Sequence, residues 1–227
     1  QKTAYEIKEC DWSSDVCSSD LFQTMFGGIQ LLAPARILHF NEQLDLKEWS
    51  YWDYNFTDTD ETMDEHTARE ETLRLFRQAV DRQMVADVGV GSYLSGGMDS
   101  GSITSVASSV VPRLKTFTCG FDMSYTTGRE ANFDERRDAE LMASLFRTEH
   151  YEQVLNSSDL SWALPNLVWH LEELRVGMSY PNYYIAGLAS KFVKVCLSGA
   201  GGDELYGGYP WRYYRVGHSL DQIGKAH

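Results

Sequence analysis

The sequence predicts an α/β fold in which a parallel sheet is flanked by helices and preceded by a small β segment. From residue 88 onward, strand-like apolar runs alternate with helix-like segments, a pattern typical of parallel sheets covered on both faces. Two glycine-rich segments each begin directly after a strand-like run, where ligands bind at the edge of such sheets. About 200 residues are enough to bury one good core, so we expect one main domain.

Residues 1–21 are set apart because they resemble a translated sequencing adapter. The run Asp11–Leu21 contains Asp-Trp-Ser-Ser-Asp-Val-Cys-Ser-Ser-Asp, which back-translates in frame to GAC TGG AGT TCA GAC GTG TGC TCT TCC GAT. This matches a common short-read adapter, and Gln1–Ile7 resembles adapter sequence in the same way. We interpret residues 1–21 as an adapter-derived artefact and exclude them from the fold reasoning. A natural N-terminal tail is the alternative.

The composition of the remaining chain indicates a cytoplasmic protein with reduced thiols. The formal net charge is −13, and it becomes −10 once the two lysines and five acids of residues 1–21 are excluded. An acidic chain without a basic stripe argues against a nucleic-acid partner. Cys119 and Cys196 lie in apolar runs without metal-ligand spacing, so we expect buried thiols and no zinc site. No apolar run is long enough to span a bilayer and no signal peptide is visible, so no membrane partner is expected.

The chain before the main α/β region is expected to hold short strands, turns, a linker and one helix. Glycine and proline punctuate Met25–Tyr54, and Ile37–Phe40 is strand-like. The polar and acidic run Asn55–Asp64 is a linker candidate. Glu65–Met84 is expected to be an amphipathic helix, because four apolar residues follow helical spacing. These residues are Leu73, Phe76, Val80 and Met84.

After this helix, strands and helices alternate. Strands are expected at 88–94, 114–121, 150–154 and 193–197, and helices at 101–111, 133–146, 158–173 and 180–192. Right-handed crossovers place the loops that follow parallel strands at the same edge of the sheet. Ser95 and Ser198 both come directly after expected strands. We therefore expect the two glycine-rich segments to meet.

The first glycine-rich segment is Ser95-Gly96-Gly97-Met98-Asp99-Ser100. A glycine pair between serines at a strand-to-helix turn offers backbone N–H groups and hydroxyls to an anion, and the following helix adds its positive dipole end. No lysine stands where a Walker A loop requires one. The sequence therefore predicts a phosphate loop in which Asp99 holds Mg²⁺ against the phosphates.

Both glycine-rich segments resemble motifs of a known family. Ser95–Ser100 resembles the S-G-G-x-D-S pyrophosphate loop of the ATP-pyrophosphatase superfamily, whose fold is adenine nucleotide alpha hydrolase-like. Ser198–Tyr209 has the sequence Ser-Gly-Ala-Gly-Gly-Asp-Glu-Leu-Tyr-Gly-Gly-Tyr and resembles a motif of the class B, glutamine-hydrolysing asparagine synthetases. Met25–Asp53 is similar to the end of the N-terminal glutaminase domain of that family.

The resemblance implies a division into domains. Residues 22–54 correspond to the C-terminal remnant of the glutaminase (class II amidotransferase) domain, 55–64 to a linker, and 65–227 to the asparagine synthetase domain. We expect that domain to be truncated at its C-terminus, without the later lysine that contacts the phosphates in the family. The nucleophilic cysteine of the glutaminase domain is expected to be missing too. Weak or no turnover is therefore expected from this chain alone, and a homodimer is left open.

The resemblance also implies roles for individual residues. The loop residues would bind ATP and its pyrophosphate; they are Leu94, Ser95, Gly96, Gly97, Asp99 and Ser100. Asp99 and Asp203 would act in catalysis as the ligands of Mg²⁺, which neutralises the leaving pyrophosphate. Ser198 and Gly199 would lie beside the adenine and ribose, and Cys119 would line the adenine.

The implied reaction is asparagine synthesis. The side-chain carboxylate of aspartate attacks the α-phosphorus of ATP and releases pyrophosphate, and glutamine-derived ammonia then displaces AMP to form the amide. Charge develops on pyrophosphate rather than on a transferred γ-phosphoryl group, which suits a loop without the Walker lysine. The expected partners are small molecules, namely ATP, aspartate and glutamine-derived ammonia.

Ala200 departs from the family pattern. Asparagine synthetases often carry a glutamate at this position, where it is a candidate base for ammonia, and alanine cannot accept a proton. Glu204, water or a different substrate would have to compensate, although Glu204 is favoured as a helix-start residue. Three alternatives therefore stay open: a β-lactam synthetase-like or lasso-peptide cyclase-like enzyme acting on another carboxylate, another pyrophosphate-loop enzyme, or a degenerate nucleotide-binding module. The pairs Arg136-Arg137 and Glu172-Glu173 are expected to be solvated, with one of each able to reach the substrate pocket.

Overall fold

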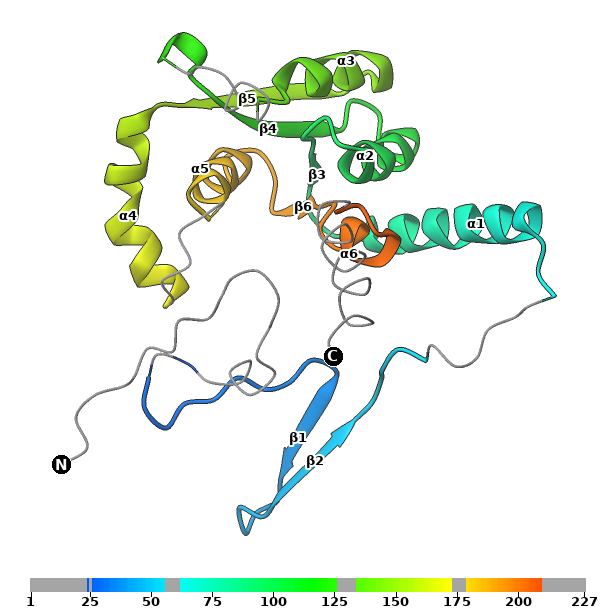
Figure 1. Cartoon of the computed structure of the whole chain (residues 1–227), viewed down its shortest axis with the longest axis vertical. Coiled ribbons are helices and arrows are strands. Elements are labelled where there is room, and N and C mark those ends of the chain that lie inside the picture. The colour runs from blue at the N-terminus through cyan, green and yellow to red at the C-terminus, as the bar shows by residue number, and fades with distance from the viewer. Residues whose placement is uncertain (1–23, 25, 56–61, 126–133, 173–178, 210–227) are drawn as a thin grey trace, which may run out of the picture. The chain divides into compact units, whose positions relative to one another are not determined.

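The computed structural model describes residue 24 and residues 26–55, 62–125, 134–172 and 179–209. The chain divides into two compact units, Gln1–Met63 with Leu171–Leu174 and Asp64–His170 with Arg175–His227. Their helices and strands are labelled in Figure 1. The segment interpreted as an adapter translation, residues 1–21, lies outside the described residues. Among the described residues, no helix is long and apolar enough to cross a membrane.

The first unit contains a β-hairpin. Strand β1 (Arg36–Phe40) pairs antiparallel with β2 (Leu46–Ser50). Asn41 closes the turn, because its backbone carbonyl accepts from the Leu44 N–H at 3.0 Å and its side chain accepts from the Asp45 N–H at 2.8 Å. Every residue of both strands is exposed, as expected for two strands without a second layer to cover them. The expected strand at 37–40 is confirmed, whereas the assignment of 22–54 to a glutaminase domain stays a prediction.

The second unit is built on a four-stranded sheet in which every pair of neighbours is parallel. Its strands are β3 (Val90–Tyr93), β4 (Lys115–Phe121), β5 (Glu149–Leu155) and β6 (Val195–Leu197), in the spatial order β5-β4-β3-β6. The register places Ser92 of β3 opposite Thr116 of β4 and Leu197 of β6. The parallel α/β sheet predicted from the sequence is therefore confirmed. β3 and β6, which precede the two glycine-rich segments, are neighbours in it.

Helices connect these strands. They are α1 (Glu65–Gln83), α2 (Met98–Val110), α3 (Arg136–Phe146), α4 (Ser157–Leu171), α5 (Ser179–Ala189) and α6 (Gly202–Tyr206), with a short 3-10 turn, η1, at Met123–Tyr125. The expected helices are confirmed with shifted ends. The starts of α2 and α3 shift most: α2 begins at Met98, inside the first glycine-rich segment, and α3 begins at Arg136. Gly97 caps α2 with extended backbone angles of φ −73° and ψ 161°.

The helices cover both faces of the sheet because side chains alternate along its strands. On β4, Phe117 faces α5, whereas the flanking Thr116 bonds His150 and Thr148 on the other face, beneath α3. Figure 1 shows α5 lying apart from α2 and α3 across the strands. Three buried clusters form the core. The first contains Val80, Ala107, Leu114 and Leu197, the second contains Phe117, Ile185, Ala189 and Val193, and the third contains Leu94, Ala139 and Ala143.

The apolar stripe of α1 is shorter than its sequence suggests. Phe76, Val80 and Met84 pack into the cluster formed with α2, as expected. Leu73 is 47% exposed. The cluster that receives α1 involves only the C-terminal half of the helix, so Leu73 has the right spacing but no described layer to pack against.

Candidate active site

The first glycine-rich segment forms a tight turn between β3 and α2. The Leu94 N–H still donates to the Phe117 carbonyl at 2.9 Å, and the helix hydrogen bonds begin when the Gly101 N–H donates to the Gly97 carbonyl at 3.0 Å. Between these points the two serines hold the turn together. The Ser95 and Ser100 hydroxyl oxygens lie 3.0 Å apart, and Ser100 Oγ also accepts from the Ser95 N–H at 3.1 Å. The N-terminal N–H groups of a 13-residue helix are therefore presented at the sheet edge.

Gly96 is required by both conformation and space. Its φ is +86°, in the left-handed region that side-chain-bearing residues rarely adopt. A Cβ at this position would lie 3.0 Å from the Glu135 carbonyl oxygen, 3.1 Å from the Ala139 nitrogen and 2.9 Å from the Asp138 Cβ. The start of α3 therefore closes over the turn. The loop is held between two helix starts, those of α2 and α3.

The second glycine-rich segment meets the first, as the topology predicts. A Cβ on Gly199 would lie 2.9 Å from the Ser100 nitrogen and 3.0 Å from the Asp99 Cβ. A Cβ on Gly202 would overlap the Asp99 carboxylate. The backbone of the second segment thus lies directly against the first turn of α2, although about a hundred residues of sequence separate the two motifs.

A cavity of about 1280 Å³ opens at the same edge of the sheet. Four of the residues singled out from the sequence line it: Leu94, Ser95, Cys119 and Ser198. The other predicted site residues do not line this cavity. They are Gly96, Gly97, Asp99, Ser100, Gly199 and Asp203. Among these, Asp99, Ser100 and Gly199 meet at the junction of the two loops. The structure therefore divides the predicted residues between a cavity wall and an adjoining loop junction.

The two thiols of the second unit are neutral at physiological pH. Burial raises the pKa of Cys119 to about 11 and that of Cys196 to about 12. Both groups are free cysteines packed beside the aromatic cluster around Phe117. Cys119 is therefore suited to be an apolar wall of the cavity rather than a nucleophile.

Glu204 is engaged within its own helix start. Its Oε2 accepts from the Gly201 N–H at 3.1 Å, and its Oε1 accepts from the Tyr209 hydroxyl at 3.0 Å. These contacts give it the capping role favoured from the sequence. They also make it a poor substitute for the acid that Ala200 lacks. The neighbouring Asp203 carboxylate lies against Gly208.

Two residues at the start of α3 differ from expectation: Glu135 was not predicted as a site residue, and Arg136 was expected to be solvated. Glu135 lines the cavity, as Ser95 does. Arg136 is partly buried, with 25% of its side chain exposed, and it donates to Asp134 at 2.6 Å and to the Phe121 carbonyl at 3.1 Å. The only sequence signal was their place at the start of an expected helix that follows β4, because such starts lie at the ligand edge of a parallel sheet. Of the two pairs expected to be solvated, Arg137 and Glu172 are exposed, and Glu173 lies outside the described residues.

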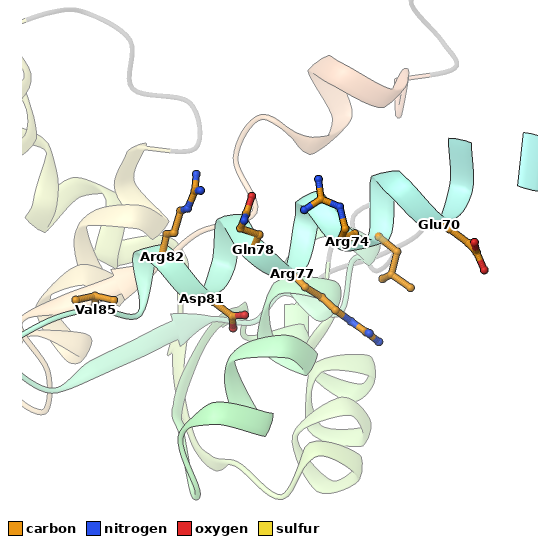
Figure 2. A pocket seen from close by; sticks show the side chains of 8 residues that line it. Glu70, Arg74, Arg77, Gln78, Asp81, Arg82 and Val85 are labelled. Atoms are coloured by element: carbon orange, nitrogen blue, oxygen red, sulfur yellow. The ribbon is translucent and has the colours of Figure 1, made fainter. Parts of the chain in front are cut away.

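A second hollow, of about 740 Å³, runs along α1 and contains no residue of either loop. Figure 2 shows its charged side chains projecting from the helix. They carry both signs, and Arg74 is already paired with Glu71 at 2.6 Å. This is the pattern of a solvated helix face. The lining residues are Glu70, Leu73, Arg74, Arg77, Gln78, Asp81, Arg82 and Val85.

Comparison with known proteins agrees with the motifs. A family model described as asparagine synthase matches residues 71–224. A glutamine-hydrolysing asparagine synthetase of Bacillus subtilis is 40% identical over 132 residues, which cover 58% of this chain and 20% of that protein. A putative glutamine-hydrolysing asparagine synthetase of Methanocaldococcus jannaschii is 31% identical over 187 residues, covering 81% of this chain and 34% of that protein. The chain thus spans about a fifth to a third of the length of these relatives.

Among solved structures, an NH3-dependent NAD synthetase from Campylobacter jejuni aligns with a TM-score of 0.36 and 15% sequence identity. The alignment covers 65% of this chain and 61% of that chain. A score this low adds no argument to the fold, which rests on the observed sheet topology. The family model alone covers more than half of the sequence. The chain therefore belongs to the asparagine synthase family.

Proposed function

We propose that this chain is the nucleotide-binding part of an ATP-dependent ligase of the asparagine synthetase type. The observation that carries the proposal is the close approach of the two loops beside the cavity. Gly199 and Gly202 lie against Asp99 and Ser100, and Ser95 and Ser198 line the cavity next to them. A phosphate loop, a second loop and an enclosed volume at one sheet edge are the parts that a nucleotide site of this topology requires.

The loop between β3 and α2 would hold the pyrophosphate part of ATP. Its backbone N–H groups, the start of α2, and the Ser95 and Ser100 hydroxyls offer hydrogen-bond donors for an anion. Cys119, with its neutral thiol, and Leu94 would form an apolar wall for the adenine. Ser198 and Gly199 would lie beside the adenine and ribose, on the side of the second loop.

Asp99 and Asp203 carry carboxylates, which are the protein ligands that Mg²⁺ commonly takes. Among the described residues, no cluster of three or more histidine, cysteine, aspartate or glutamate side chains could hold a metal on its own. Mg²⁺ in nucleotide sites characteristically takes one or two carboxylates and completes its shell with phosphate oxygens and water. When bound, the ion would neutralise charge on the pyrophosphate.

The proposed reaction has two steps. A carboxylate oxygen of aspartate bonds to the α-phosphorus of ATP, and the bond from that phosphorus to the bridging oxygen of pyrophosphate breaks. Ammonia derived from glutamine then bonds to the activated carbonyl carbon, AMP leaves, and the nitrogen loses a proton to give asparagine. The donors of the phosphate loop favour the first step because they face the charge that builds up on pyrophosphate.

The acid substrate is the most open part of this proposal. Ala200 cannot accept the proton from ammonia, and Glu204 is engaged by Gly201 and Tyr209. These two observations favour either water as the proton acceptor or a different acid substrate. The alternatives are therefore a related ligase or cyclase that activates another carboxylate, or a binding module without activity.

ATP–pyrophosphate exchange by the full-length protein, measured beside ATP binding, would distinguish these functions. Calorimetry with Mg²⁺ and ATP reports binding, and exchange of labelled pyrophosphate into ATP reports adenylation. Exchange that depends on aspartate supports the proposal, and exchange that occurs only with another acid supports the related ligase. ATP binding without exchange with any acid supports the binding module. An absence of ATP binding would overturn the nucleotide site itself.

A further inference from the structure

Arg136 joins two segments that line the cavity. It is the first residue of α3 and is not itself part of the cavity wall. Its Nη2 donates to the Asp134 carboxylate at 2.6 Å and to the Phe121 carbonyl at 3.1 Å, and its Nε donates to the same carboxylate at 2.8 Å. Phe121 is the last residue of β4 and lines the cavity. One guanidinium therefore connects the end of β4 to the start of α3.

The pair of Arg136 and Asp134 has the geometry of a specific contact. Two guanidinium nitrogens bind the carboxylate, with Nη2 on Oδ2 and Nε on Oδ1, so the two side chains are held in one relative orientation. Only 25% of the Arg136 side chain and 13% of the Asp134 side chain are exposed. Hydrogen bonds from Arg136 hold the pKa of Asp134 below its usual value, which keeps the pair ionised. Such an enclosed, two-point contact fixes geometry, unlike a mobile pair at the surface.

The strand leaves space for the Arg136 side chain at Gly120. A Cβ at Gly120 would overlap that side chain at Cγ, Cδ and Nε, and these are the three nearest atoms. The backbone of β4 is therefore the surface on which the stem of the arginine lies. Alanine at this position would displace the arginine side chain without removing its charge.

The segment that Arg136 holds also lies against the phosphate loop. The carbonyl oxygen of Glu135, the residue just before Arg136, would lie 3.0 Å from a Cβ at Gly96. One turn further along α3, Ala139 packs with Leu94 in a buried cluster. Leu94 and Gly96 both belong to the turn between β3 and α2. The place of the phosphate loop therefore depends on the placement of α3, which Arg136 ties to the end of β4.

We propose that Arg136 is a positioning residue of the nucleotide site: paired with Asp134, it fixes the cavity wall at the end of β4 and, through the start of α3, the phosphate loop. The inference rests on the proposed function of this sheet edge as a nucleotide site. Its benefit is preorganisation. A loop and a wall that are already in their binding geometry lose less conformational freedom when ATP binds, so less of the binding free energy is offset.

The test is the Kd of Mg·ATP for the whole chain, measured by calorimetry, together with urea unfolding of each variant. Arg136→Met removes the guanidinium and keeps an unbranched side chain. We expect the Kd to rise by about tenfold, because small displacements of the groups that hold a ligand are costly. Arg137→Met is the matched control, since it makes the same change at the next residue, which is exposed. It should leave the Kd unchanged.

Two further variants separate positioning from charge and from stability. Arg136→Lys keeps the charge but cannot form the two-point contact, so it should bind Mg·ATP nearly as weakly as Arg136→Met. Gly120→Ala keeps the arginine but displaces its side chain, so it should also raise the Kd. This variant provides the test if Arg136→Met does not fold.

The outcomes that contradict the inference are distinct. A folded Arg136→Met with the wild-type Kd overturns the inference alone, because a purely structural role would lower the urea midpoint without changing the affinity of the folded chain. Full recovery of affinity in Arg136→Lys, or a wild-type Kd in Gly120→Ala, does the same. A wild-type chain that does not bind Mg·ATP overturns the inference together with the proposed nucleotide site.

Discussion

The contact between the two loops depends on the absence of a side chain at Gly199. A Cβ at this position would lie 2.9 Å from the Ser100 nitrogen, 3.0 Å from the Asp99 Cβ and 3.2 Å from the Asp99 carbonyl carbon. Ordinary contacts of a Cβ begin near 3.4 Å. Gly199→Ala therefore requires a movement of a few tenths of an ångström at the start of α2 or in the second loop.

The cost of this substitution follows from which atoms would have to move. Two of the three opposing atoms belong to the backbone of the first turn of α2, which packs on the sheet, and neither is the flexible end of a side chain. Overpacking of this kind costs about 1–3 kcal/mol. The moving atoms include the N–H groups that the phosphate loop presents, so we expect Mg·ATP binding to weaken by about tenfold or more.

Gly187→Ala is the matched control. Gly187 lies inside α5, and a Cβ at this position would meet no atom within 4 Å. The same chemical change should therefore stabilise the protein by about 0.5–1 kcal/mol, because alanine is the better helix former. Urea unfolding gives the stability of each variant, and calorimetry gives its affinity for ATP. If Gly199→Ala binds ATP as tightly as Gly187→Ala and is equally stable, the close approach of the loops has no functional meaning.

Four further predictions concern single side chains. Asp99→Asn should weaken Mg·ATP binding by about tenfold or more while leaving urea unfolding nearly unchanged, since the carboxylate would act as a metal ligand. Cys119 and Cys196, with pKa values of about 11 and about 12, should resist iodoacetamide at pH 8, and bound ATP should protect only Cys119 when the pH is raised. Glu204→Gln should lower the free energy of unfolding by about 0.5–1 kcal/mol, because the capping bonds weaken, without loss of ATP binding. Burial lowers the pKa of His150, so the fold favours the neutral form of this side chain. The resulting stability is present above the unfolded pKa of about 6.5 and is lost as the pH falls. His150→Asn should therefore reduce the drop in melting temperature between about pH 7.5 and about pH 5.

The fold was accessible from the sequence because its signals are local. Alternating apolar runs and helical segments gave the strand and helix order, and the handedness of crossovers then placed both loops at one edge. The start of α2 was harder to place. Gly97 follows another glycine and looks like a loop residue by composition, but it adopts a cap conformation and the helix begins directly after it, at Met98. The loop and the helix start are one structural unit here, which residue propensities cannot show.

The site was less accessible because part of it depends on tertiary contacts. Glu135 belongs to no motif, and it lines the cavity because α3 begins against Gly96. Arg136 looks like a surface charge in the sequence, yet its guanidinium is held by Asp134 and the Phe121 carbonyl at the end of β4. Both residues follow a strand that the sequence did predict. What the sequence could not show is that the start of α3 packs against Gly96.

The glycines of the second motif leave space that residues of the first motif occupy. The Asp99 carboxylate occupies the space that a side chain at Gly202 would need, so any larger residue there would displace the proposed metal ligand. Asp203 follows Gly202 directly in the chain. Gly202 therefore leaves room for the Asp99 carboxylate, and the same close approach brings Asp203 to this sheet edge.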